Sequence, residues 1–335
     1  MNEAMRDVPT AMDIATVGSE DIRLMTKVAR LYHEQGVRQP EIAERLNISQ
    51  PRVSRLLKKA VAVGIVRTTV VTPRGVYSAL EEEIERRYAA REVVVADTGD
   101  LDDEQALTPA LGSVAASYLE TTLIGGEKIG ISSWSSVLLA AVDSMRPRAG
   151  GGVTEVVQVL GGTGVVVAQA HATRLTGRLA HITGAQAIYL PTPGMVASRQ
   201  TRDALLQDAA ISSTVERYAH LTVLLAGIGS LSPSPLLRAS GNTFGADGEA
   251  ALRAAGAVGD VCMRFFDASG APVSTALDDR VVGIDAGTLR AIPRRIGVAG
   301  GRRKREAIRA ALLGGWVNTL VTDHATAEYL RETAP

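Results

Sequence analysis

The 335-residue sequence predicts an α/β protein in two parts, a small all-helical domain followed by a large domain built on a mainly parallel sheet. Between residues 21 and 75, apolar residues such as Leu24, Val28 and Leu31 recur at helical spacing. From residue 92 onward, short runs of β-branched residues alternate with helical stretches, which is typical of a buried parallel sheet. The predicted organisation is a flexible arm over 1–20, a helical domain over 21–75, a connector helix over 76–91 and the large domain over 92–335.

The composition is that of an ordinary globular protein. Lys plus Arg equals Asp plus Glu at 36 each, which excludes a general polycation but permits a basic segment. The lone Cys262 excludes a disulfide within one chain and fits a reducing compartment. We find no N-terminal secretion signal and no apolar run of roughly 18 residues, the length of a membrane span. We therefore expect a cytoplasmic protein.

Residues 39–60 carry the pattern of a helix-turn-helix motif. Ala43 supplies the small residue that is needed where the second helix crosses the first. Asn47 tolerates the positive φ that the turn requires. Val53 and Leu56 fall where apolar side chains must hold the second helix from beneath. The spacing therefore predicts two short helices that meet at Asn47, the second one placed to enter a DNA groove.

The ends and the charge of this second helix support the same interpretation. Ser49 can cap it, and Pro51 stands in its first turn, where proline is tolerated. Residues 21–75 hold eleven basic residues against four acidic ones, a net charge of +7 inside a neutral chain. A plain helical hairpin with a solvated basic face is the alternative. We predict DNA contacts from Gln39, Gln50, Arg52, Ser54, Arg55, Lys58 and Lys59. The β-branched run after Gly64 predicts a strand over residues 64–73.

Eight runs of the large domain are expected to be strands, over residues 92–97, 128–132, 155–160, 187–191, 221–229, 280–284, 295–301 and 318–323. Ligands of open α/β sheets bind at loops that follow strands, and four such loops carry hydroxyls, glycines or cations. Serine hydroxyls and backbone amides at a helix start suit an anion such as phosphate. Glycine in such a loop often serves only the turn, but four loops in one domain favour a phosphorylated ligand. The candidate ligand residues are Ser132, Ser133, Ser135, Ser136, Gly161, Gly162, Thr163, Gly227, Gly229, Asp267 and Lys304.

Carboxylates after strands are a weaker signal. Asp260, Asp267, Asp285 and Asp323 each stand after a strand or open a turn, so each could bind sugar hydroxyls. A capping or turn role is at least as common for aspartate in such places.

An enzyme is the natural competitor of a ligand-binding domain. The five histidines are scattered without metal-ligand spacing, and neither a nucleophile elbow nor a phosphate-binding P-loop is present. Cys262 stands among apolar residues and is expected to be a packed, inert thiol. We therefore expect no catalytic residue, no metal site and no cofactor. Two alternatives stay open: a sugar-phosphate isomerase or deaminase behind a DNA-binding head, and a DNA-binding scaffold whose large domain binds a protein.

Seven segments, in one order along the chain, resemble the SorC family of bacterial sugar-responsive transcription regulators. They span about residues 21 to 332 and include the helix-turn-helix over 31–66, "VVQVLGGTG" over 156–164, "AGIGSL" over 226–231, and "VAGGRRKREAIRAALLGGWVNTLVTD" over 298–323. The resemblance implies a winged-helix-like DNA-binding head on an effector domain related to glucosamine-phosphate deaminase and ribose-phosphate isomerase. It also implies a homotetramer whose affinity for operator DNA changes when a phosphorylated sugar binds.

The family's ligand loops carry over by motif onto Ser135 and Ser136, Gly161 and Gly162, Gly227 and Gly229, and Lys304. Two departures matter. Trp134 stands where a glycine is usual, and Leu160 stands where relatives that bind a second phosphate have arginine. We therefore expect a monophosphorylated sugar or polyol that controls carbohydrate metabolism genes.

Overall fold

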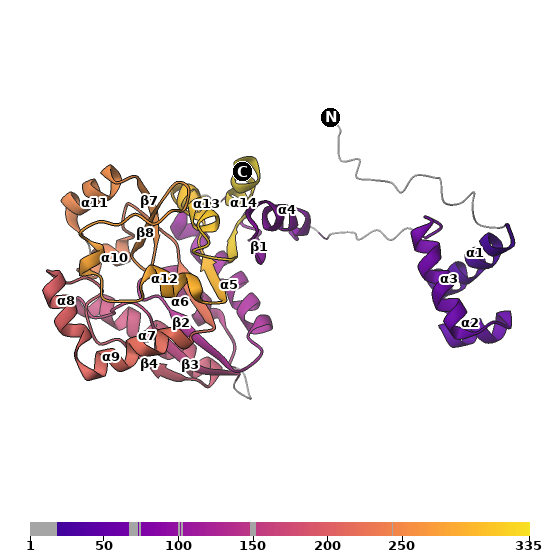
Figure 1. The fold of residues 1–335 in the computed structure, drawn as a ribbon, viewed down its shortest axis with the longest axis horizontal. Helices are drawn as coiled ribbons and strands as arrows, with labels where there is room; N and C mark the ends of the chain where they lie inside the picture. The colour runs from indigo at the N-terminus through magenta and orange to yellow at the C-terminus, as the bar shows by residue number, and fades with distance from the viewer. Residues whose placement is uncertain are drawn as a thin grey trace. The chain divides into compact units, whose positions relative to one another are not determined.

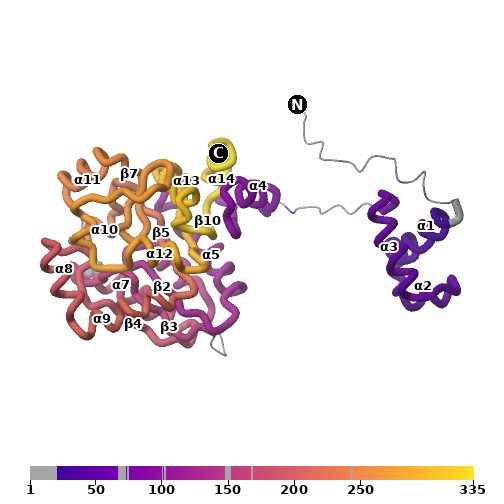
Figure 2. Tube along the Cα trace, viewed as in Figure 1, coloured from indigo at the N-terminus to yellow at the C-terminus, as the bar shows by residue number. Residues whose placement is uncertain are grey.

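The computed structural model describes residues 19–66, 73, 75–99, 101, 103–147, 152–242 and 244–335. The chain divides into two compact units, Met1–Val71 and Thr72–Pro335. Figures 1 and 2 show both units, with most of the helices and strands labelled. The strand that we predicted over 64–73 falls largely outside the described residues.

The first unit, called the head below, is a three-helix domain formed by α1 (Ser19–His33), α2 (Gln39–Leu46) and α3 (Gln50–Ala62). Asn47 ends α2 in the left-handed region at φ 51° and ψ 47°, as the pattern predicted. Its N–H donates to the carbonyls of Ala43 and Glu44. The three helices share one core made by Met25, Val28, Ala29, Ile42, Ala43, Val53, Leu56, Leu57 and Ala60. Full burial of one aliphatic side chain is worth roughly 1.5–3 kcal/mol, so this cluster is the main source of the head's stability.

The predicted cap of α3 is only half realised. Ser49 occupies the N-cap position with extended backbone, and Pro51 lies in the first turn. The Ser49 side chain, however, accepts no hydrogen bond from the backbone of α3. The helix start is therefore set by the proline and by the apolar packing beneath it.

The second unit confirms the predicted α/β class. Its main sheet has seven parallel strands in the order β1 (Glu92–Ala96), β10 (Thr319–Asp323), β9 (Arg294–Val298), β5 (Val223–Gly227), β2 (Glu127–Ile131), β3 (Val153–Gln158) and β4 (Gln186–Ile188). A second sheet of three strands is antiparallel, with β6 (Gly229–Ser230), β7 (Ala257–Val261) and β8 (Arg264–Asp267).

Helices cover both faces of the main sheet. Successive residues of a strand point to opposite faces, so they pack against different helix layers. Leu224 and Ala226 of β5 pack with α4 (Ser78–Tyr88), α12 (Ala286–Ala291), α13 (Arg305–Leu313) and α14 (His324–Glu332). Val223 and Leu225 of the same strand face α5 (Glu104–Thr122), α6 (Ser136–Ser144) and α7 (Val166–Thr183). The remaining helices are α8 (Arg199–Leu206), α9 (Ala209–Glu216), α10 (Pro235–Ala239) and α11 (Gly245–Ala254), with single 3₁₀ turns at 217–220, 278–280 and 302–304. The result is a three-layer α/β sandwich.

One predicted strand was wrong. Residues 280–284 form only isolated bridges, from Val281 to Met195 and from Gly283 to Leu160. The segment pairs with two different loops, so no continuous ladder can form. Its apolar run is explained by burial among loops instead of in the sheet.

The strand order reverses between β2 and β5. After β2 the chain adds β3 and β4 on one side of it, whereas β5, β9 and β10 lie on its other side. In open parallel sheets, a crevice forms outside the carboxyl ends of the strands at such a reversal. The loops after β2 and β5 are therefore the expected place for a ligand.

Candidate functional site

The surface of α3 carries the predicted DNA contacts. Gln50, Arg52, Arg55, Lys58 and Lys59 are exposed, whereas Val53, Leu56 and Leu57 on the opposite side are buried. The two remaining candidates, Gln39 of α2 and Ser54 of α3, are partly exposed. The seven side chains therefore lie at the surface of the head.

The basic residues of α3 differ from Arg30 of α1 and Arg45 of α2. Arg30 pairs with Glu34 at 2.9 Å, and Arg45 pairs with Glu41 at 2.5 Å. Within the described part of the chain, Arg52, Arg55, Lys58 and Lys59 have no acidic group within 4.0 Å. The cations of α3 are thus free to meet phosphate oxygens and base edges.

A pocket lies at the strand-order reversal of the second unit. It is lined by the loops after β2 and β5, by the β7–β8 turn and by the turn after β9. Its free space of about 90 Å³ is well above the roughly 10–15 Å³ that one water needs, so it admits a group of several atoms. The predicted residues that line it are Ser132, Ser135, Ser136, Gly227, Gly229 and Lys304.

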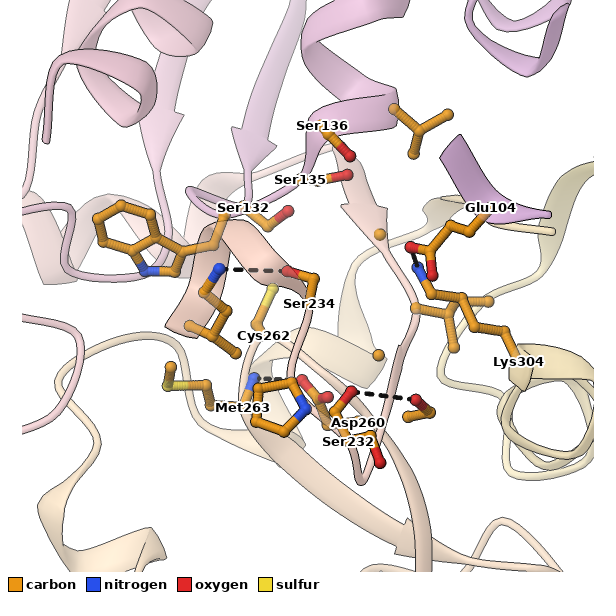
Figure 3. A pocket seen from close by; sticks show the side chains of 18 of the residues that line it. Glu104, Ser132, Ser135, Ser136, Ser232, Ser234, Asp260, Cys262, Met263 and Lys304 are labelled. Atoms are coloured by element: carbon orange, nitrogen blue, oxygen red, sulfur yellow. Dashed lines mark hydrogen bonds and ion pairs between the residues drawn. The ribbon is translucent and has the colours of Figure 1, made fainter. Parts of the chain in front are cut away.

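The serine loop presents the start of α6 to this pocket. Ser135 is the N-cap, and its hydroxyl accepts from Leu138 N at 3.3 Å. Ser136 is the first helical residue and is exposed. Figure 3 shows both hydroxyls near Ser132 at the end of β2. The first amides of a helix and its dipole favour an anion at this position.

Opposite the serines, two cations share one carboxylate. Lys304 Nζ lies 2.7 Å from Glu104 Oε1, and Arg303 pairs with the other oxygen of Glu104. Figure 3 shows Glu104 and Lys304 turned toward each other. Burial alone would raise the pKa of Glu104, but Lys304 and Arg303 outweigh it and lower that pKa. Glu104 is therefore charged at neutral pH.

A second carboxylate, Asp260 of β7, forms the back of the pocket. Its Oδ2 accepts from Met263 N at 2.9 Å, which holds the two-residue β7–β8 turn. Cys262 and Met263 in that turn have φ values of 54° and 58°, a conformation that costs energy for most residues other than glycine and asparagine. Burial raises the pKa of Asp260 to about 6, against the lowering effects of the Met263 amide and Lys304. Burial also raises the pKa of Cys262 to about 12, so that thiol stays protonated.

Five predicted ligand residues lie outside the pocket lining. Ser133 is fully buried and donates to the Leu160 carbonyl at 2.6 Å. A side chain on Gly161 or Gly162 would collide with Pro193 or Gln158, which explains both glycines by packing. The remaining two candidates serve local structure: Thr163 N donates to the Thr192 carbonyl at 2.9 Å, and Asp267 accepts from the amides of Ser269 and Ala271.

The structure gives each of the four aspartates that the sequence left ambiguous a distinct role. Asp285 and Asp323 cap α12 and α14, where each accepts from a backbone amide of the first turn. Asp267 closes the turn after β8. Asp260 alone of the four lines the pocket.

Several lining residues were not predicted as ligand contacts. Among them are Glu104, Trp134, Leu160, Ser230, Ser232, Ser234 and Arg303, together with the β7–β8 turn. The "SLSPS" run over 230–234 was a visible signal, since it follows a strand and carries three hydroxyls. Glu104 had no local signal, because it comes from the start of α5 and meets Lys304 only in the fold.

Within the described ranges, no three His, Cys, Asp or Glu side chains are grouped so that they could hold a metal ion. Among the helices of those same ranges, none combines the length and apolar character that crossing a membrane requires.

Two family models match the chain. A sugar-binding domain model matches residues 76–331, and a model of the MarR family matches residues 29–74. The first match covers nearly all of the α/β unit, including its pocket. The second covers α2, α3 and part of α1.

Curated relatives match along nearly the full length. The deoxyribonucleoside regulator of Bacillus subtilis is 34% identical over 313 residues, which is 93% of this chain and 98% of that protein. The sorbitol operon regulator of Klebsiella pneumoniae is 31% identical over 316 residues, with the same shares covered. Both relatives are named as regulators.

Two solved structures of transcriptional regulators are similar to this chain in fold. The full-length sorbitol operon regulator SorC from Klebsiella pneumoniae aligns with a TM-score of 0.69 at 29% identity, over 93% of this chain and 100% of that one. The sugar-binding domain of the transcriptional regulator DeoR from Pseudomonas syringae pv. tomato aligns with a TM-score of 0.61 at 38% identity, over 77% of this chain and 100% of that one.

Proposed function

The chain belongs to the SorC and DeoR type of sugar-binding transcriptional regulators, and from that premise we propose that its effector is a monophosphorylated sugar or polyol. The effector binds in the pocket at the β2–β5 reversal and changes the affinity of the head for operator DNA. The genes under control are those of carbohydrate metabolism. One observation carries the proposal: Lys304 and the start of α6 line one pocket.

The pocket chemistry favours an anionic group with hydroxyls attached. Lys304 and the amides at the start of α6 would bind the phosphate, together with the hydroxyls of Ser135 and Ser136. Asp260 would accept hydrogen bonds from sugar hydroxyls. Gly227 and Gly229 line the same pocket and leave room for the side chains of Ser135 and Asp260.

A single phosphate fits the distribution of charge. Among the described residues, Arg303 and Lys304 are the cations that line the pocket, and they are adjacent in sequence. Leu160 forms an apolar part of the wall, where a second phosphate would need a cation. The relatives named for a deoxyribonucleoside and for sorbitol are consistent with a sugar or polyol ligand.

In the head, we assign base contacts to Gln50, Arg52 and Arg55, and phosphate contacts to Lys58 and Lys59. We also infer a homotetramer with several heads that read half-sites. Sedimentation would test the assembly. The effector can change DNA affinity only if it binds two quaternary arrangements with different affinity, and a coupling of about 1–3 kcal/mol would be typical.

The test is calorimetric titration of the full-length protein with phosphorylated sugars and polyols and with their unphosphorylated parents. Lys304→Met should weaken binding of the phosphorylated compound by roughly 10- to 100-fold, the value of a hydrogen bond to a charged group. Lys128→Met is the matched control, because Lys128 lies near the opposite end of β2. Equal binding by the Lys304 and Lys128 variants would contradict the assignment of the pocket.

A further inference from the structure

Glu104 already forms ion pairs with the two pocket cations that an anionic ligand would bind. One of its carboxylate oxygens pairs with Lys304 and the other with Arg303. The Lys304 side chain is only 12% exposed, and it lines the pocket. An anion that reaches Lys304 therefore meets a lysine that already has a counter-ion.

The position of Glu104 on its helix does not explain these contacts. Glu104 is the first residue of α5, and an acidic side chain there favours the helix dipole even when it faces water. The start of α5 is already capped, because Asp103 accepts from Gln105 N and Ala106 N at 3.0 and 3.1 Å. The pairing with both cations is thus an additional feature of the fold.

The two cations differ in how firmly they are held. Arg303 also donates to the Ser230 hydroxyl at 3.0 Å and to the Ser232 carbonyl at 2.5 Å. For Lys304, Glu104 is the acidic partner within the described residues. The Glu104 side chain is 28% exposed, so it has room to turn toward solvent. Release of Glu104 would leave Arg303 in place and free Lys304 for another anion.

We propose that Glu104 is an internal counter-ion of the pocket, and that the anionic group of the effector binds Lys304 in exchange for it. The proposal rests on the proposed function, since it takes the pocket as the anion site. Because of this exchange, the Glu104 carboxylate competes with any anion for Lys304. A bare anion such as inorganic phosphate therefore binds weakly, while a sugar phosphate compensates through its hydroxyl contacts. Glu104 is in this sense a specificity-determining residue.

The experiment is calorimetric titration of the full-length protein with inorganic phosphate at fixed pH and ionic strength. Glu104→Gln keeps the shape of the side chain but removes its charge, so phosphate should bind roughly tenfold tighter, the factor expected from loss of an ordinary competing charge. Glu249→Gln is the control, because Glu249 pairs with Arg253 at 2.9 Å and lies outside the pocket lining. It should bind phosphate like the unmodified protein.

The other outcomes separate the two proposals. Unchanged or weaker phosphate binding by Glu104→Gln would overturn the counter-ion proposal, provided that Lys304→Met weakens phosphate binding. If phosphate binding is the same with and without the Lys304 side chain, the anion pocket itself is wrong and the proposed function fails. A loss of sugar-phosphate affinity without any change for phosphate would make Glu104 a hydroxyl contact instead.

Discussion

Gly229 lies against Asp260 so closely that no side chain fits between them. A Cβ atom added to Gly229 would lie 1.9 Å from Asp260 Oδ1 and 2.9 Å from its Cγ. The Gly229→Ala variant must therefore displace the carboxylate that accepts from Met263 N at 2.9 Å. That hydrogen bond to a charged group is worth about 1.5–3 kcal/mol. The turn it holds contains two residues at positive φ, each at a cost of roughly 1–2 kcal/mol when unsupported.

We therefore expect Gly229→Ala to lower the free energy of unfolding of the second unit by about 2–4 kcal/mol. Urea denaturation followed by tryptophan fluorescence measures this unit selectively, because Trp134 and Trp316, the only tryptophans, both lie in it. Gly227→Ala is the comparison. Its Cβ would meet the Ser135 hydroxyl at 2.9 Å, and loss of that helix cap costs about 1 kcal/mol.

A double-mutant cycle tests the reasoning. In an Asp260→Ala background the space beside residue 229 is open, so the added methyl group should cost less than about 1 kcal/mol. If Gly229→Ala destabilises the protein equally in both backgrounds, the collision with Asp260 is not the cause of the destabilisation.

Three further predictions concern the head and the pocket. Asn47→Ala should destabilise the head by roughly 1–2 kcal/mol, because alanine is strained at φ 51°. Asn47→Gly should be nearly neutral, and circular dichroism melting compares the two; equal melting would contradict the strain argument. Arg52→Ala should cost on the order of 1–3 kcal/mol in anisotropy titrations with operator DNA if Arg52 contacts a base, and unchanged affinity would remove it from the contact set. Sulfate should bind tighter as pH falls from about 7.5 to 5.5, since Asp260 with its pKa of about 6 takes up a proton and loses the charge that repels the anion. Calorimetry on Asp260→Asn should show a much flatter pH profile, and an identical profile would exclude Asp260 as the source.

The features that could be predicted from the sequence are those written in local patterns. Ala43, Asn47 and Val53 specify the helix-turn-helix within a few residues of one another, and the parallel strands appear as short apolar runs. Ser135 and Lys304 followed from the rule that ligands gather after parallel strands. No contact between distant segments was needed for any of these predictions.

The features that could not be predicted from the sequence depend on contacts between distant parts of the chain. Glu104 meets Lys304 across 200 positions of sequence, and no local pattern marks it. Ser133 was grouped with its neighbours as a ligand residue, but its side chain turns to the Leu160 carbonyl. The β7–β8 turn escaped prediction because cysteine and methionine stand where Asn-Gly is usual.

In the proposed function, a phosphorylated sugar or polyol in the pocket controls the affinity of the head for DNA. The most direct measurement is fluorescence anisotropy of the full-length protein on DNA from upstream of its own gene, at fixed salt, with a panel of sugar and polyol phosphates and their parents. We expect sequence-specific binding that one phosphorylated compound shifts by roughly 5- to 150-fold and its parent does not. Specific binding that no compound shifts would contradict the effector assignment, and absence of specific binding would contradict the assignment of α3 as the recognition helix.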